Sequence, residues 1–248
     1  MPPDIKAPFG AWPGDVDRID LQGRRLAASG SAIVRTSQDE RHVLKSFYSL
    51  TGSNMAPRVE HELRMMLLAG EDISVSVTGR ILVKGNLEGF VMPHETPLDL
   101  GAAKATKRRW IEQLQLLVRR MHDKGIIHGD IKPDNVLVRK RDGNLVLCDF
   151  AAAQLKVEAT QPTEGTSAYQ SAWRCREYSL PLCAADDLYA LGVSIWHIWL
   201  GRAPFDADDH ESLDEDIAGG LKPDLNLVDD ETVRSLIETY LASAPAGV

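Results

Sequence analysis

Apolar residues in the first part of the chain follow the periods of a small sheet and one helix. Two β-rich runs, 32–35 and 42–47, flank a polar turn and predict a hairpin. Apolar residues then recur at helical spacing between a proline and a glycine, which predicts an amphipathic helix over about 57–69. Two further strands are predicted at about 74–84 and 87–92.

The rest of the chain has a mainly helical pattern. Apolar residues line one face of the segment 110–121, and we expect this helix to end at Gly125. The run 188–201 has no Asp, Glu, Lys or Arg, but it is shorter than the roughly 18 apolar residues of a membrane span, so it predicts a buried helix. The short apolar segments 126–127 and 136–138 bracket a loop, and the run 144–148 predicts a strand.

These elements predict an α+β chain with a β-rich part followed by a helical part. Residues 1–17 are rich in Pro and Gly and predict little regular structure, in an extension over 1–20 that either packs through its aromatic residues or is left loose. A β-rich N-lobe with one helix should follow over 21–94, and a mainly helical C-lobe over 95–248.

Composition narrows the classes of function. An apolar content of 44% and a charged content of 26% are those of a soluble globular protein. The net charge of -8 argues against a nucleic-acid or anionic-membrane partner, because such binding requires a basic face. Three cysteines without disulfide density or metal spacing, and a start without an apolar signal core, predict a cytoplasmic or nuclear protein with no membrane anchor.

The candidate chemistry is concentrated in a polar loop between the apolar segments 126–127 and 136–138, and at the end of the strand that follows. Four residues carry it: Asp130, Lys132, Asn135 and Asp149. Phosphoryl transfer from a metal-bound nucleotide requires such a set, because it needs oxygen ligands for the metal, a cation for the phosphate and an acceptor for a hydroxyl proton. Each residue alone could cap a turn, but all four at these spacings favour a catalytic role.

With these motifs the chain resembles the eukaryotic-type protein kinase family from about residue 24 to 206. The resemblance implies a two-lobed protein-kinase-like fold, ATP and Mg²⁺ as cofactors, and a protein substrate with a Ser or Thr hydroxyl. It implies that Asp130 is the catalytic base and that Lys132 neutralises the transferring phosphoryl group. Asn135 and Asp149 are implied as the metal ligands.

The resemblance also assigns residues to the nucleotide. Lys45 resembles the strand lysine that holds the α- and β-phosphates, and its expected partner is Glu62, with Glu60 as the alternative. The other residues implied in nucleotide binding are Ala27, Ser29, Gly30, Met92 and His94.

The loop that should cover the phosphates departs from the family pattern. Ala27, Ser29 and Ala32 stand where the family usually has three glycines, and Gly30 is the only glycine there. Cβ atoms limit the approach of backbone N–H groups to phosphate, so we expect nucleotide to bind weakly or in a changed pose.

Two further departures lie beside the catalytic residues. Gly129 replaces an arginine that in many protein kinases pairs with a phosphorylated activation loop, so we expect activity that does not depend on loop phosphorylation. Ala151 replaces the glycine after Asp149-Phe150, which is tolerable if its φ stays negative. His-Gly-Asp also begins this loop in related small-molecule phosphotransferases. Those enzymes commonly lack the lysine that follows, so Lys132 favours the protein-kinase branch.

The C-lobe lacks the Ala-Pro-Glu motif that the family usually has after the activation loop. Thr166 resembles the residue that contacts the catalytic Asp and Lys, but Ser171-Ala172-Trp173 then stands in place of Ala-Pro-Glu. No match follows for the arginine that pairs with that glutamate, so we expect a rebuilt, shortened C-lobe. Asp187 resembles the aspartate that braces the catalytic loop, a role compatible with a simple N-cap. The acidic run 206–216 predicts a solvated face.

Three functions fit these residues. The first is an ATP-dependent kinase of Ser or Thr hydroxyls, since every charged catalytic position is filled. The second is a pseudokinase that binds nucleotide or protein without turnover, which the altered glycine loop and the missing Ala-Pro-Glu support. The third is a small-molecule kinase. The filled catalytic positions favour the first.

Overall fold

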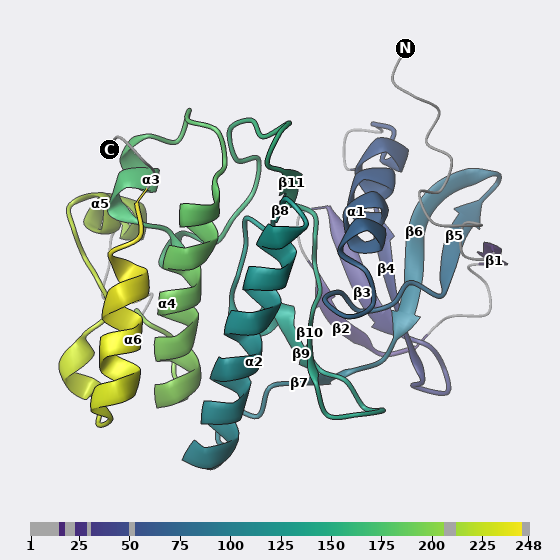
Figure 1. Cartoon of the computed structure of the whole chain (residues 1–248). Coiled ribbons are helices and arrows are strands. Elements are labelled where there is room, and N and C mark those ends of the chain that lie inside the picture. The colour runs from purple at the N-terminus through teal and green to yellow at the C-terminus, as the bar shows by residue number, and fades with distance from the viewer. Residues whose placement is uncertain (1–14, 18–22, 29–30, 50–52, 206–211, 245–248) are drawn as a thin grey trace. The chain divides into compact units, whose positions relative to one another are not determined.

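The computed structural model describes residues 15–17, 23–28, 31–49, 53–205 and 212–244 (Figure 1). The chain divides into two compact units, Met1–Thr96 and Pro97–Val248. The first contains a sheet and one helix, and the second is mainly helical.

The sheet of the first unit has six strands in the order β1-β5-β6-β4-β3-β2. Their bounds are β1 Asp15–Asp17, β2 Arg25–Ala28, β3 Ala32–Thr36, β4 His42–Phe47, β5 Gly79–Val83 and β6 Asn86–Pro93. The pairing of β3 with β4 is antiparallel, which confirms the predicted hairpin. The pairing of β5 with β6 is also antiparallel.

The sequence predicts the start of one strand of this sheet wrongly and misses another strand. The predicted strand over 74–84 begins only at Gly79: Ile73 N and Ser74 N donate to Gly70 O in a turn, and residues 75–78 have no regular structure. Within the segment 1–17, residues Asp15–Asp17 form a strand parallel to β5, although three residues are too few to show a period in the sequence. Residues 1–14 lie outside the described residues.

Helix α1 (Ala56–Ala69) begins with a proline in its first turn and ends before Gly70, as the sequence predicts. It buries Val59, Glu62 and Leu63 and packs against β6. The sheet adds a buried cluster of Leu44, Ile81 and Val91. These contacts fix the position of α1 on the sheet, and with it the position of Glu62.

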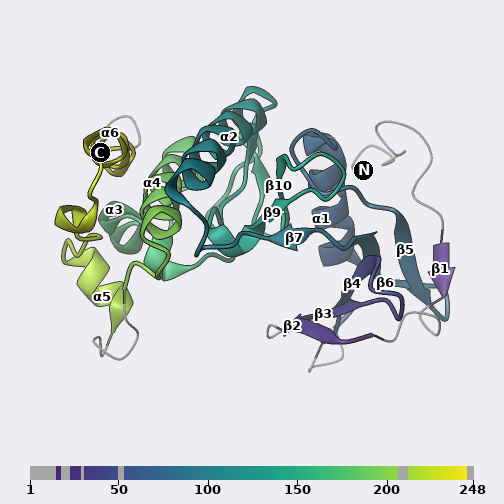
Figure 2. The same cartoon turned by 90° about the horizontal axis from the view of Figure 1, so that it is seen from below.

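The second unit is built around α4 (Ala184–Leu200), which lies between α2 (Lys104–Asp123) and α6 (Glu231–Leu241) in both views (Figures 1 and 2). Nearly all of α4 from Tyr189 onward is buried, which confirms the buried helix predicted over 188–201. It ends at Gly201, whose φ of 75° is left-handed. The predicted apolar face of α2 is likewise buried.

Short elements connect these helices. They are β7 Thr96–Pro97 at the boundary of the units, β8 Ile126–Ile127, β9 Val136–Val138, β10 Leu145–Leu147, β11 Gln154–Leu155, α3 Ala172–Arg176 and α5 Leu213–Ala218, with 3₁₀ turns η2 Pro133–Asn135, η3 Ser167–Tyr169 and η5 Leu225–Leu227. β9 pairs with β10, and β8 pairs with β11. Residues 214–216 are exposed on α5, as predicted for this part of the acidic run. Over the described residues, no helix is both long and apolar enough to cross a bilayer.

Candidate active site

The polar loop after β8 is held at its start by a buried carboxylate of α4. Asp187, which is 1% exposed, accepts hydrogen bonds from the backbone N–H groups of His128 and Gly129, each at 2.8 Å. His122 Nε2 lies 2.8 Å from the same carboxylate. These contacts confirm the predicted bracing of the loop by Asp187.

Asp130 lies at the centre of a compact polar cluster. Lys132 Nζ donates to Asp130 Oδ2 at 2.7 Å, and Asn135 Nδ2 donates to the same oxygen at 3.0 Å. The Thr166 hydroxyl donates to Asp130 Oδ1 at 2.7 Å and accepts from Lys132 Nζ at 2.6 Å. The structure thus brings together three of the predicted site residues and the predicted contact of Thr166. A carboxylate fixed in this way can orient a hydroxyl group and accept its proton.

Asp149 follows β10 in a left-handed backbone conformation, with φ of 61°. This is uncommon for a residue other than glycine, and such conformations concentrate at functional sites. The backbone N–H of Cys148 donates to Asn135 O at 3.0 Å. The residue directly before Asp149 is therefore hydrogen-bonded to the loop that carries Asn135. Among the described residues, Ala151 is not one of those with positive φ. Its backbone therefore meets the requirement for an alanine in place of the family's glycine.

The fit of Mg²⁺ depends on the oxygen donors of Asn135 and Asp149. The amide nitrogen of Asn135 is engaged by Asp130, which leaves the carbonyl oxygen as its ligand atom. Among the residues that the structure describes, no group of three or more His, Cys, Asp and Glu could hold a metal by itself. Two oxygen donors still fit Mg²⁺, because this ion is usually bound by one or two protein ligands together with substrate phosphates and water.

The predicted lysine and glutamate pair is formed in the first unit. Lys45 Nζ of β4 lies 2.8 Å from Glu62 Oε1 of α1. Lys45 is 8% exposed and Glu62 is 1% exposed, whereas Glu60 is exposed. The structure therefore selects Glu62 over the alternative, and it places a buried ammonium group that could hold phosphate.

The other residues assigned to the nucleotide lie in the first unit or outside the described chain. Ala27 is exposed on β2 opposite Val34, and Met92 is buried on β6. His94 follows β6, and its backbone N–H donates to Arg41 O at 2.8 Å. Ser29 and Gly30 lie outside the described residues.

Sequence reasoning missed two buried contacts in the second unit. The Tyr169 hydroxyl lies 2.7 Å from His197 Nδ1, and Tyr169 ends the 3₁₀ turn that follows Thr166. Arg174 is 2% exposed and pairs with Asp186 at 2.7 Å, so the region that lacks Ala-Pro-Glu has a buried ion pair of another kind. The only signals in the sequence were an arginine beside Trp173 and a doublet of aspartates before an apolar helix.

Gly129 is required by the backbone at this position. Its φ is +79°, and a Cβ there would lie 3.0 Å from Ala152 O and from a methyl group of Leu182. We expect Gly129→Ala to lower the free energy of unfolding by about 1–2 kcal/mol from the left-handed conformation, and further through these contacts. Gly143→Ala is the matched control in urea unfolding, because Gly143 has φ of +71° with no atom within 4 Å. Equal losses in the two variants would contradict the close packing at Gly129.

The contact between Tyr169 and His197 predicts a dependence of stability on pH. Burial lowers the pKa of His197 from its ordinary 6.5, against the opposing effect of Asp134, so the folded protein favours the neutral ring. The unfolded state then binds more protons below pH 6.5, and the free energy of unfolding should fall as the pH drops from about 7 towards 5.

His197→Asn isolates this contribution, since asparagine keeps an acceptor for the Tyr169 hydroxyl and does not titrate. Urea unfolding at pH 7.5 and pH 5 should show a smaller loss of stability in this variant than in the unsubstituted protein. An unchanged loss would show that His197 does not contribute.

Comparisons with known proteins find a matching family model and several similar sequences. A family model described as the protein kinase domain matches residues 85–245. The serine/threonine-protein kinase pim-2 of Danio rerio is 34% identical over 56% of this chain and 42% of its own length. The serine/threonine-protein kinase PknL of Mycobacterium tuberculosis is 31% identical over 39% of the chain and 26% of its own length. The dual specificity protein kinase FUZ7 of Mycosarcoma maydis is 38% identical over 40% of the chain and 24% of its own length. The matches thus span less than half the length of each of these relatives.

Among solved structures, the PK-1 kinase of the Cydia pomonella granulovirus superposes with a TM-score of 0.66. The superposition covers 89% of this chain and 86% of the viral chain at 18% sequence identity. At this identity the likeness shows the fold alone. It confirms the predicted α+β class, with a β-rich first part and a helical second part.

Proposed function

This chain belongs to the protein kinase family, and from that premise we propose that it transfers the γ-phosphoryl group of ATP to a Ser or Thr hydroxyl of a protein substrate, with Mg²⁺. The observation that carries the proposal is the cluster of Asp130, Lys132 and Thr166, whose three side chains contact one another at 2.6–2.7 Å. A base, a cation and a hydroxyl held this closely form the acceptor side of a phosphoryl-transfer site.

Each side chain has one task in the proposed reaction. Asp130 accepts the proton of the substrate hydroxyl, and Lys132 balances the negative charge that moves towards the acceptor oxygen. Asn135 and Asp149 would hold Mg²⁺, which would supply positive charge that neutralises the phosphates. Lys45 binds the α- and β-phosphates, with its ammonium group oriented by Glu62. Ala27, Met92 and His94 would contact the nucleotide, and the assignment of Ser29 and Gly30 stays a prediction from the sequence, because both lie outside the described residues.

The segment between Asp149 and Thr166 supports the proposal that no phosphorylation switch is needed. β11 pairs with β8, and the side chain of Gln154 accepts a hydrogen bond from Thr160 N at 2.7 Å. Leu182 N donates to Thr160 O at 2.8 Å. Neutral hydrogen bonds thus order this segment, in a chain where Gly129 replaces the arginine that would pair with a phosphate.

The test is a transfer assay with γ-labelled ATP, Mg²⁺ and a mixture of protein substrates. We expect label on Ser or Thr residues, its loss when Mg²⁺ is chelated, and its loss in Asp149→Asn, which keeps the size of the side chain but weakens the metal site. Transfer no greater than in Asp149→Asn would contradict the proposal, and binding of ATP in that case would favour a pseudokinase. Label found on small molecules and on no protein would favour a small-molecule kinase.

A further inference from the structure

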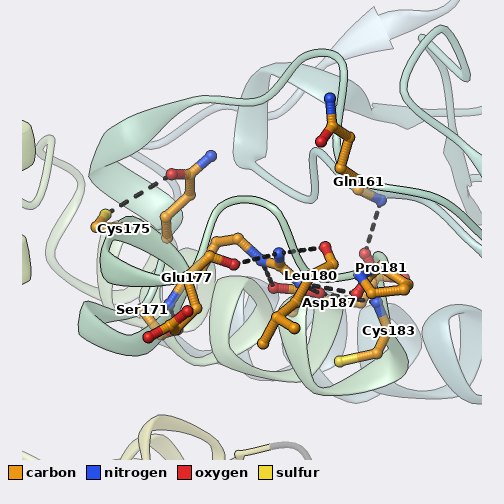
Figure 3. Close-up of polar contacts among 12 residues, drawn as sticks. Gln161, Ser171, Cys175, Glu177, Leu180, Pro181, Cys183 and Asp187 are labelled. Atoms are coloured by element: carbon orange, nitrogen blue, oxygen red, sulfur yellow. Dashed lines mark hydrogen bonds and ion pairs between the residues drawn. The ribbon is translucent and has the colours of Figure 1, made fainter.

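Arg174 in α3 is buried and has a partner for each of its guanidinium N–H groups. Its Nε and one terminal nitrogen bind the two oxygens of Asp186 at 2.7 and 2.8 Å. The remaining N–H groups donate to backbone carbonyls, and the acceptors are Glu177 O at 3.2 Å, Leu180 O at 2.8 Å and Pro181 O at 3.0 Å. Figure 3 labels the three residues whose carbonyls accept these bonds, together with Cys183 and Asp187 at the start of α4. All five donors of the guanidinium are used in a site where the side chain is 2% exposed.

Asp186 connects this arginine to the first turn of α4. It also accepts a hydrogen bond from Cys183 N at 2.8 Å, which caps the helix. The next residue, Asp187, binds the N–H groups of His128 and Gly129. Two adjacent carboxylates of one helical turn therefore bind different partners: Asp186 binds Arg174, and Asp187 binds the loop that carries Asp130. A shift of this turn would move both contacts together.

A second connection runs through the chain itself. Thr166 is fixed by Asp130 and Lys132, and Ser171 Oγ accepts a hydrogen bond from Arg174 N at 3.2 Å at the start of α3. The segment from Thr166 to Arg174 is thus held at both ends. Arg174, Asp186, Asp130 and Thr166 all line one pocket of the second unit, so the ion pair forms part of the wall of the space beside the proposed base.

We propose that Arg174 and Asp186 are a positioning pair, which holds the first turn of α4 and the segment before α3 so that Asp187 and Thr166 orient Asp130. The pair lies in the region that lacks Ala-Pro-Glu, but it joins an arginine of α3 to the first turn of α4. Its catalytic consequence rests on the proposed function, whereas its effect on the loop does not. An ordinary structural ion pair would change stability alone.

The experiment compares Arg174→Lys with the control Arg176→Lys. Arg176 lies on the same helix but is exposed, with a bond to Ala218 O. Lysine keeps the charge at position 174 but cannot form the paired contacts with Asp186 and also reach three carbonyls. We expect kcat to fall roughly 10- to 100-fold in folded Arg174→Lys with KM for ATP within about twofold, because small displacements of a catalytic group have effects of this size. Arg176→Lys should leave both values unchanged.

Amide hydrogen exchange of the peptide that contains His128 and Gly129 gives a readout that needs no activity. We expect its exchange to be at least about tenfold faster in Arg174→Lys, with exchange in α2 unchanged. If that variant does not fold, Asp186→Asn is measured in the same way, since it keeps an acceptor for Cys183 N. Unchanged exchange at His128 and Gly129 in a folded variant would overturn the proposal. If the unsubstituted protein transfers no phosphate, the proposed function fails and exchange alone decides on the positioning pair.

Discussion

Asp130→Asn should lower the rate of phosphoryl transfer by a factor of roughly 10² to 10⁴, the range typical for loss of a general base. Asparagine has the same shape, but its amide cannot accept the proton of the substrate hydroxyl. It also turns one of the two oxygens that now accept from Lys132, Asn135 and Thr166 into a donor. The rate is measured with γ-labelled ATP at saturating Mg²⁺, and the melting temperature shows that the fold persists.

Asp123→Asn is the matched control for this substitution. Asp123 is exposed at the end of α2, so the same chemical change there should leave the rate unaltered. A rate for Asp130→Asn within about threefold of this control would show that the carboxylate is not the base. The cluster around Asp130 would then have a structural role alone.

The sequence predicted those parts of the fold and site whose residues are close along the chain or have a regular period. Asp130, Lys132 and Asn135 lie in one short loop, so their spacing was enough to group them. Glu62 was identified on α1 because apolar residues follow it at helical spacing, and its contact with Lys45 is confirmed at 2.8 Å. The buried run of α4 was evident from its lack of charge.

Other features depend on backbone geometry or on contacts that no period reveals. Nothing in the sequence shows that Gly129 has φ of +79° or that Asp149 has φ of 61°. The strand β1 is too short for a pattern and exists through its ladder with β5. Arg174 and Asp186 are separated by a loop, and their pairing follows only from the three carbonyls that fix the guanidinium group. Long-range contacts of this kind form where the fold brings polar groups together, and local propensity does not encode them.

Lys45→Met should lower the free energy of unfolding by about 3–5 kcal/mol, the cost of removing one partner from a buried ion pair. Methionine fills a similar volume, but it leaves the carboxylate of Glu62 without its ammonium partner at a site that is 1% exposed. Lys84→Met changes an exposed lysine of the same unit and should stay within about 0.5 kcal/mol of the unsubstituted protein. Both values are measured by urea unfolding.

The double variant Lys45→Met, Glu62→Leu tests the physical reason for this loss. If the cost comes from a buried carboxylate that has lost its ammonium partner, removing that carboxylate as well should recover most of the stability, because a buried ion pair and an apolar pair of similar volume are often close in free energy. The double variant should therefore be more stable than Lys45→Met although it carries one more substitution. If the two substitutions lower the free energy of unfolding additively, the two side chains act independently. The ion pair would then not hold Lys45 in its position. We expect no phosphoryl transfer in Lys45→Met or in the double variant, since recovered stability does not replace the cation that binds the phosphates.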